Sequence, residues 1–237
     1  MSLGIMQPYF FPYLGHFSLI QHTDRWIVFD TVQYIDRGWM NRNRIIHPDQ
    51  PETIYITVPV TAHRDTRICD VRIDASQPYA ERILGQLSAS YKKRAPYYRA
   101  VSALVEECLA KERHSLRDLN ILCLKRVCGY LGIPLNLQIF SQMELPVEPV
   151  HGPDEWALNI CKALGETDYL NPPGAMAMFD RQKYAAAGVS IRFLNFEPTP
   201  YNQRKNRFFE SLSVLDAMMF CSPAEIVDML NCYTLLS

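Results

Sequence analysis

The chain has 237 residues, 48% of them hydrophobic and 21% charged, which is typical of a globular protein with one large domain or a core with a subdomain. Its formal net charge of −1 argues against a nucleic-acid partner, and no apolar run approaches the roughly 20 residues of a membrane-spanning helix, so membrane insertion is not expected. The seven cysteines include no Cys-x-x-Cys pair, which favours free thiols and no metal site. The N-terminus lacks the features of a signal peptide, so we expect a cytoplasmic protein.

The start of the chain is predicted to form a strand, a helix and a second strand. Leu3–Met6 is a short strand that ends before Pro8, and Leu14–His22 has the apolar spacing of a helix. Trp26–Phe29 is continuously apolar, as expected of a strand that is buried on both faces. A strand-helix-strand unit of this length predicts two parallel strands.

The rest of the chain alternates between predicted strands and helices. Alternating β-branched residues mark strands, and apolar spacing of three and four residues marks helices. In chain order, these elements are a strand beginning near Arg44, strands at 53–60 and 68–73, helices at 78–90, 95–112 and 115–131, a strand at 135–140, a helix at 153–164, a strand tip near 168–170, a helix at 180–187, a strand at 190–196, a helix from about 211, and a last helix with Ser222 as N-cap and Pro223 at its first position.

These elements predict an α/β fold with an N-terminal Rossmann-like (HUP/nucleotidyltransferase-like) parallel sheet and a helical C-terminal portion. Residues 1–77 are expected to hold the βαβ core and a ligand-binding platform. Residues 78–237 are expected to form a helical and mixed portion that packs on the same core, so that both portions make one compact domain.

Polar residues follow each of the first two predicted strands. Gln7 and Tyr9 come after the first strand, and Asp30 and Gln33 come after the second. Ligands of open parallel sheets bind beyond the carboxyl ends of the strands, so we expect Gln7, Tyr9 and Gln33 to contact a ligand. Asp30 is a candidate for ligand binding or proton transfer. The alternative is that its carboxylate stabilises a loop.

The segment Tyr13-Leu14-Gly15-His16 resembles the His-x-Gly-His element of nucleotidyltransferase-like and synthetase-like Rossmann folds, with Tyr13 in place of the first histidine. In that element the glycine lets the backbone approach a nucleotide, and the histidines and the helix N-terminus hold phosphates. The resemblance implies that Tyr13 and Gly15 contact the ligand and that His16 stabilises charge or transfers a proton. The alternative is a structural glycine beside a surface histidine.

The segment Trp39-Met40-Asn41-Arg42-Asn43-Arg44 carries side chains suited to a polar ligand. The fork of Arg42 matches a phosphate or carboxylate, and Trp39 offers a face to a sugar or base. The amides of Asn41 and Asn43 are suited to hydroxyl or peptide groups. The alternative is a structural turn with buried amides.

Two further groups complete the predicted site. His63 follows a predicted strand and is a third candidate for proton transfer, although most single histidines are structural or exposed. Tyr201, Gln203 and Ser213 are predicted to close over the ligand, with a helix-capping arrangement as the alternative. The basic run at 204–207 is predicted to be a solvated face.

Three N-terminal stretches form a characteristic series: Met6-Gln7-Pro8-Tyr9-Phe10-Phe11-Pro12-Tyr13-Leu14-Gly15, then Phe29-Asp30-Thr31-Val32-Gln33-Tyr34, then Gly38-Trp39-Met40-Asn41-Arg42-Asn43-Arg44-Ile45. Matching segments continue at 57–60, at Tyr91 with 95–97, at 168–170, at Gly174, at 201–203 and at 212–216. Over nearly its full length, the chain thus resembles the WbqC-like proteins.

The resemblance implies an enzyme of bacterial surface-polysaccharide or specialised-metabolite biosynthesis. The implied reaction transfers an acyl or aminoacyl group, such as glycyl, to an amine, with ATP or an acyl thioester donor as the cofactor. A small-molecule substrate is the expected partner, and a homodimer is left open. The alternative is a non-catalytic ligand-binding or assembly subunit of such a pathway.

Overall fold

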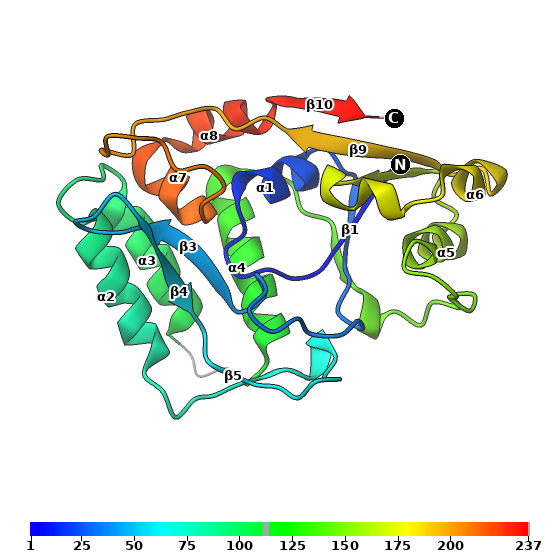
Figure 1. The fold of residues 1–237 in the computed structure, drawn as a ribbon, viewed down its shortest axis with the longest axis horizontal. Coiled ribbons are helices and arrows are strands. Elements are labelled where there is room, and N and C mark those ends of the chain that lie inside the picture. The colour runs from blue at the N-terminus through cyan, green and yellow to red at the C-terminus, as the bar shows by residue number, and fades with distance from the viewer. Residues whose placement is uncertain (111–113, 237) are drawn as a thin grey trace.

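A computed structural model of the chain describes residues 1–110 and 114–236, which are arranged around a six-stranded sheet (Figure 1). The strands of this sheet are β1 (Ser2–Met6), β2 (Arg25–Val28), β7 (Leu137–Ile139), β8 (Asp168–Asn171), β9 (Ser190–Phe196) and β10 (Tyr233–Leu236). They lie in the order β10-β9-β8-β1-β2-β7, and all pairs are parallel except the antiparallel pair of β9 and β10. This arrangement confirms the predicted α/β fold with a Rossmann-like parallel sheet.

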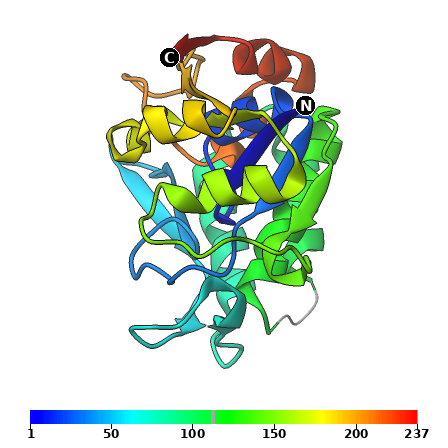
Figure 2. The ribbon, with the colours of Figure 1, turned by 90° about the vertical axis from the view of Figure 1, so that its right-hand side faces the viewer.

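The strand order reverses between β1 and β8. From β1 the chain builds outward through β2 and β7 on one side, and then through β8, β9 and β10 on the other. Helices α1 (Leu14–Gln21) and α4 (Leu116–Leu131) contribute to the hydrophobic cluster on one face of the sheet. Helices α5 (Glu155–Leu164) and α6 (Arg181–Ala186) contribute to the cluster on the other face, as Figure 2 shows from the side. This is the order of a doubly wound fold, whose ligands bind where the strand order reverses.

Side chains of the central strands alternate between the two faces. In β2, Trp26 and Val28 enter the cluster beneath α1 and α4, whereas Ile27 enters the cluster beneath α5 and α6. Gly4 in β1 lies against the Trp26 ring, where an added Cβ would be 2.7 Å from a ring carbon. The close approach of β1 to Trp26 therefore requires glycine at this position.

The remaining elements lie beside the sheet, and α8 packs against α1. The helices are α2 (Tyr79–Tyr91), α3 (Tyr98–Leu109), α7 (Val214–Phe220) and α8 (Pro223–Leu230), and the short 3₁₀ turns are η1 (Ile68–Asp70), η2 (Phe140–Gln142) and η3 (Pro173–Met178). Two small antiparallel pairs are β3 (Arg42–Ile46) with β4 (Thr53–Thr57) and β5 (Val60–Thr61) with β6 (Arg72–Ile73). The β3–β4 hairpin packs between α2 and α7, at the left of Figure 1.

The structure differs from the predicted elements in a few places. The predicted strand at 68–73 begins as the turn η1, because the N–H groups of Ile68 and Cys69 bond to Val32 O and Asp30 O in the loop after β2. The predicted strand at 53–60 is interrupted at Pro59, which has no N–H for a ladder. The predicted helix at 95–112 begins at residue 98, and its residues 111 and 112 lie outside the described part. The strand β10 was not predicted.

All seven cysteines are free thiols, as predicted. Five of them are buried, Cys69 is half-buried and Cys232 is exposed. Within residues 1–110 and 114–236, no helix combines the length and the apolar character that crossing a membrane requires. The division of the chain at residue 77 stays a prediction.

Candidate functional site

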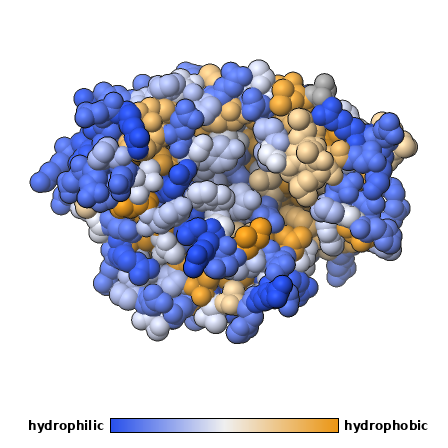
Figure 3. Space-filling model, viewed as in Figure 1, coloured by the Kyte–Doolittle hydropathy of each residue, from blue (hydrophilic) through white to orange (hydrophobic). Residues whose placement is uncertain are grey.

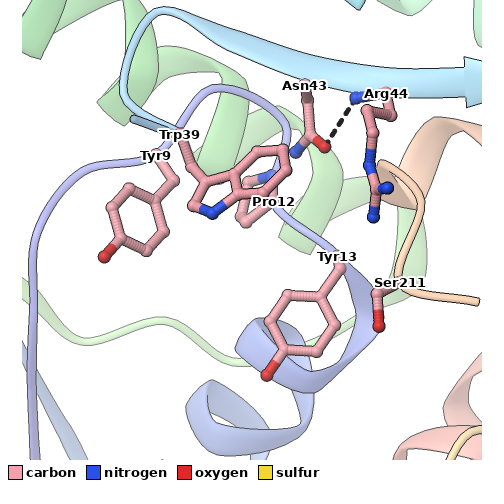
Figure 4. A pocket seen from close by; sticks show the side chains of 7 residues that line it. All are labelled: Tyr9, Pro12, Tyr13, Trp39, Asn43, Arg44 and Ser211. Carbon is pink, nitrogen blue, oxygen red and sulfur yellow. Dashed lines mark hydrogen bonds between the residues drawn. The ribbon is translucent and has the colours of Figure 1, made fainter. Parts of the chain in front are cut away.

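A cavity of about 230 Å³ lies beside the loop of residues 7–13, which leaves the carboxyl end of β1 and leads into α1 (Figure 4). Its lining residues are Tyr9, Pro12, Tyr13, Trp39, Asn43, Arg44 and Ser211. We call it the aromatic cavity. The loop forms one side and the start of the β3–β4 hairpin forms the other, while the face of the molecule seen in Figure 3 is hollowed near its centre. The cavity thus lies beyond the carboxyl end of β1, and ligands of open parallel sheets bind beyond the carboxyl ends of strands.

Polar side chains from other elements hold the loop of residues 7–13 in place. Asn43 Nδ2 donates to the carbonyls of Phe10 and Phe11, at 3.1 and 2.8 Å. Ser213 Oγ also donates to the Phe11 carbonyl, at 2.8 Å. Phe11 has a φ of +40°, a conformation that is strained for any residue but glycine, and these hydrogen bonds keep it there.

Two further asparagines connect segments near this loop. Asn120 Nδ2 in α4 donates to the carbonyls of Pro8 and Met40, at 2.9 and 2.8 Å. Asn41 Nδ2 donates to the Val58 carbonyl at 2.9 Å. The buried amides predicted as an alternative are therefore present, and a ligand contact of Asn41 or Asn43 stays a prediction.

The Tyr9 and Tyr13 rings shape the cavity. Tyr13 folds over Gly15 at the start of α1, where an added Cβ would lie 2.4 Å from the ring, and on its other side it meets Phe196 edge-on at 6.3 Å between centroids. The Tyr9 hydroxyl donates to Gln7 Oε1 at 3.3 Å. Burial raises the pKa of both phenols above the usual value, so both hydroxyls are neutral hydrogen-bond donors at neutral pH.

Arg42 and Arg44 point to the same side of β3 but have different surroundings. The Arg42 guanidinium lies 4.4 Å from the centroid of the Tyr55 ring and donates to the Arg37 carbonyl. The Arg44 guanidinium lies 5.4 Å from the Trp39 ring and lines the cavity. Its Nε is buried without a partner, and the guanidinium makes no hydrogen bond or ion pair with any described residue. Arg44 is therefore the cation that the structure places at the cavity.

Asp30 is fully buried at the end of β2, and the chain itself satisfies its carboxylate. Ser141 donates its N–H to Oδ1 at 3.0 Å and its hydroxyl to Oδ2 at 2.6 Å. Arg117 at the start of α4 donates to Oδ2 at 3.1 Å. Asp30 does not line the aromatic cavity. This geometry agrees with the loop-stabilising alternative, and a role in proton transfer stays a prediction.

His16 is buried under the loop and does not line the cavity. Its ring packs against Tyr9 and Trp26, at 5.7 and 5.1 Å between centroids, and its Nδ1 has no partner among the described residues. Burial lowers the pKa of His16 to about 3, so the imidazole is neutral near pH 7. A neutral imidazole cannot supply the positive charge that a bound phosphate attracts.

Gln33 and His63 lie together at another cavity of about 510 Å³, between the loop after β2 and the loop after β5. Both side chains are exposed, and Gln33 Nε2 donates to the Arg64 carbonyl. Neither residue lines the aromatic cavity. The structure therefore separates these two predicted site residues from Tyr9 and Tyr13.

Tyr201, Gln203 and Ser213 organise the start of α7. Ser213 is its N-cap and accepts from the Leu215 N–H at 3.3 Å. The Tyr201 hydroxyl and Gln203 Nε2 donate to the buried Asp216 carboxylate at 2.7 and 2.8 Å. Burial raises the pKa of Asp216 to about 6, although the hydrogen bonds it accepts oppose this shift. The capping arrangement predicted as an alternative is present.

The structure brings together four of the predicted site residues at the cavity: Tyr9, Tyr13, Trp39 and Asn43. Sequence reasoning missed Pro12, and it chose Arg42 over Arg44 although both belong to one motif. The period-two alternation of a strand could have shown that both arginines share a face, but it could not rank them. In the described part of the chain, no group of three or more His, Cys, Asp or Glu side chains is placed to hold a metal ion.

The sequence of the chain is similar to those of known proteins over nearly its full length. The model of the WbqC-like protein family matches residues 7–228. An uncharacterized protein of Mycobacterium tuberculosis strain H37Rv, Rv1507c, is 28% identical over 231 residues, which cover 97% of each chain. No solved structure matches this chain.

Proposed function

The chain belongs to the WbqC-like protein family, and from this premise we propose that it is a cytoplasmic transferase that binds its donor in the aromatic cavity. The proposed reaction transfers an acyl or aminoacyl group, such as glycyl, to an amine in surface-polysaccharide or specialised-metabolite biosynthesis. The amine nitrogen bonds to the acyl carbon, the bond from that carbon to the donor's leaving group breaks, and the amine loses a proton.

The observation that carries the proposal is the position of Arg44. Its guanidinium faces the cavity beside Trp39 and has no anionic partner in the described part of the chain. A partly buried cation without a counter-ion favours an anionic ligand. The Trp39 and Tyr9 rings, which line the same cavity, favour a ligand that also carries a flat ring.

Two sources of the activated acyl group share this chemistry. A coenzyme A thioester carries the acyl group itself, whereas ATP first reacts with a carboxylate to give an acyl-adenylate and pyrophosphate, and the acyl-adenylate is then the donor, with AMP as its leaving group. ATP and a coenzyme A thioester both carry an adenine ring and several phosphates, which suit the aromatic rings and Arg44 respectively. At about 230 Å³ the cavity is smaller than the roughly 300–1,000 Å³ of a pocket for a drug-sized ligand, so it holds one part of such a donor.

The alternative function is a non-catalytic ligand-binding or assembly subunit. One observation favours it: the described residues that line the cavity include no His, Cys, Asp or Glu. Among the lining side chains, only the neutral hydroxyls of Tyr9, Tyr13 and Ser211 can donate or accept a proton. Binding without turnover is the outcome that this alternative predicts.

Arg44→Ala and Arg42→Ala form a matched pair for testing the site. We expect Arg44→Ala to weaken ATP or acetyl-coenzyme A binding by about tenfold or more, because a hydrogen-bonded charge contributes roughly 1.5–3 kcal/mol. Arg42→Ala should change the affinity by less than about twofold. Binding is measured by calorimetry and by quenching of Trp39 fluorescence, with Trp39→Phe as the fluorescence control.

Turnover is measured on the same proteins. With ATP and glycine, AMP or pyrophosphate is followed. With a thioester and an amine, release of the free thiol is followed. Binding that depends on Arg44 without either product would establish the non-catalytic alternative. Equal affinities of wild type and Arg44→Ala would overturn the proposed site.

A further inference from the structure

A separate cavity of about 410 Å³ lies between the β3–β4 turn, the connection from α2 to α3, and the loop before α7. Its lining residues are Pro48, Asp49, Gln50, Pro51, Arg94, Arg204, Lys205 and Asn206. We call it the basic cavity. In Figure 1 these segments meet at the upper left, where the orange loop approaches the end of α2, and the same region of Figure 3 is strongly hydrophilic.

Two cations from distant parts of the chain converge on one carbonyl in the basic cavity. Arg94 donates to Pro48 O at 2.7 Å, and Lys205 Nζ donates to the same oxygen at 3.2 Å and to Gln50 O at 3.1 Å. Arg204 faces the same cavity from a backbone with a φ of +53°. Two segments that lie more than a hundred residues apart in sequence thus bring three positive side chains together at this cavity.

The described residues compensate these charges only in part. No carboxylate among them forms an ion pair with Arg94, Arg204 or Lys205, and the one carboxylate that lines the cavity is that of Asp49. Burial and the nearby Arg94 charge lower the pKa of Lys205, while Asp49 opposes this shift. One carboxylate faces three positive charges, so the cations still repel each other and an anion in the cavity would relieve the repulsion.

Most hydrogen-bond donors of these cations stay free. A guanidinium has five N–H donors and an ammonium has three. Arg94 uses one of them on Pro48, Lys205 uses two on backbone carbonyls, and the Arg204 side chain bonds to no described residue. The free donors of two guanidinium forks match the several acceptor oxygens of a phosphate better than the two of a carboxylate.

We propose that the basic cavity binds the phosphate group of a small phosphorylated molecule, through Arg94, Arg204 and Lys205. The volume of about 410 Å³ exceeds that of a phosphate alone, so the rest of the molecule also has room in the cavity. This site is distinct from the aromatic cavity, whose cation is Arg44. The predicted solvated face at 204–207 is in this proposal a binding surface.

Pyrophosphate is the probe for the test, titrated by calorimetry at constant ionic strength into the full chain. Arg204→Gln removes a charge whose side chain bonds nothing in the described structure, and we expect about threefold weaker binding. Lys205→Met should weaken binding about tenfold. Lys205→Arg, which keeps the charge, should stay within about twofold of wild type.

Arg99→Gln is the matched control, because it removes an exposed positive charge on the neighbouring helix α3 and should leave the affinity unchanged. Arg44→Ala should also leave pyrophosphate binding unchanged, which separates this inference from the proposed donor site. Melting temperatures show whether each variant is folded.

Three outcomes would overturn the inference. In the first, wild type binds no pyrophosphate. In the second, the double variant Arg204→Gln/Lys205→Met binds as tightly as wild type. In the third, binding is lost in Arg44→Ala and kept in Lys205→Met, which would place the anion in the aromatic cavity.

Discussion

Arg42 and Arg44 differ by their neighbours rather than by their type. Both extend from β3, and both lie over an aromatic ring. Arg42 contacts Tyr55 and donates one hydrogen bond to a backbone carbonyl, whereas the Arg44 guanidinium donates none in the described structure, although the Nε atoms of both are buried without a partner. Arg44 lines the aromatic cavity and has more donors left for a ligand than Arg42, which is why we assign the anion contact to Arg44.

Neighbours also decide how the His16 side chain behaves. Its pKa of about 3 in the folded state lies below the value of 6.5 for an unperturbed side chain. As pH falls below 6.5, the unfolded chain binds a proton that the folded chain does not, so folding stability is lost progressively toward pH 3. This acid sensitivity follows from burial and does not require a ligand.

We predict that His16→Phe removes this acid sensitivity. Between pH 7 and pH 4.5, the free energy of unfolding of wild type should fall by about 2–3 kcal/mol more than that of the variant, measured by urea denaturation. Asp216, whose pKa of about 6 acts in the opposite direction, is present in both proteins and cancels in the comparison. The exposed His63→Gln serves as the control and should follow wild type. Parallel curves for wild type and His16→Phe would contradict the prediction.

At the scale of elements, the site depends on polar groups that tie one element to another. The Asp30 carboxylate connects the end of β2 to the start of α4 through Arg117 and to η2 through Ser141. Asn43 and Ser213 connect β3 and α7 to the loop after β1. These residues therefore shape the cavity by fixing its walls.

We predict that Asp30→Asn destabilises the protein by about 3 kcal/mol, because breaking a buried ion pair leaves Arg117 without its partner at Oδ2. Arg117 also pairs with Asp118, whose side chain is 49% exposed, so Asp118→Asn is the matched control and should cost less than about 1 kcal/mol. Urea denaturation measures both changes. An unchanged stability of Asp30→Asn together with lost ATP or thioester binding would instead make Asp30 a ligand contact.

At the scale of the whole molecule, the sheet joins distant parts of the sequence. β1 and β2 come from the first thirty residues, and their outer neighbours β7 and β8 come from residues 137–139 and 168–171. Side chains from both halves of the chain fill the two hydrophobic clusters. A βαβ unit cut away from these partners would expose to water the face that α5 and α6 cover and the outer edges of β1 and β2.

We therefore predict that the chain unfolds in one cooperative step. Urea transitions followed by tryptophan fluorescence and by far-ultraviolet circular dichroism should coincide, since Trp26 and Trp156 pack on opposite sides of the sheet. A fragment of residues 1–77 should show no cooperative transition. Two separate transitions, or a folded fragment, would contradict the idea of one compact domain.

The sequence by itself determined the parts of the structure that depend on local pattern. Apolar runs and short polar breaks placed β1, α1 and β2, and the rule for strand ends directed attention to the region beyond β1, where the candidate cavity lies. The predicted N-cap also acted as expected: Ser222 caps the last helix, and its side chain accepts from the Glu225 N–H. Each of these features involves residues only a few positions apart.

Only the tertiary structure decided which side chains are free to meet a ligand. Whether Asp30, His16 and Asn43 have partners depends on Ser141, Trp26 and Phe11, which pattern alone does not pair with them. The strand order and the edge strand β10 likewise depend on contacts between distant segments. A polar side chain is available for chemistry when the fold leaves its hydrogen-bonding groups unsatisfied, and that condition is set by neighbours far away in the sequence.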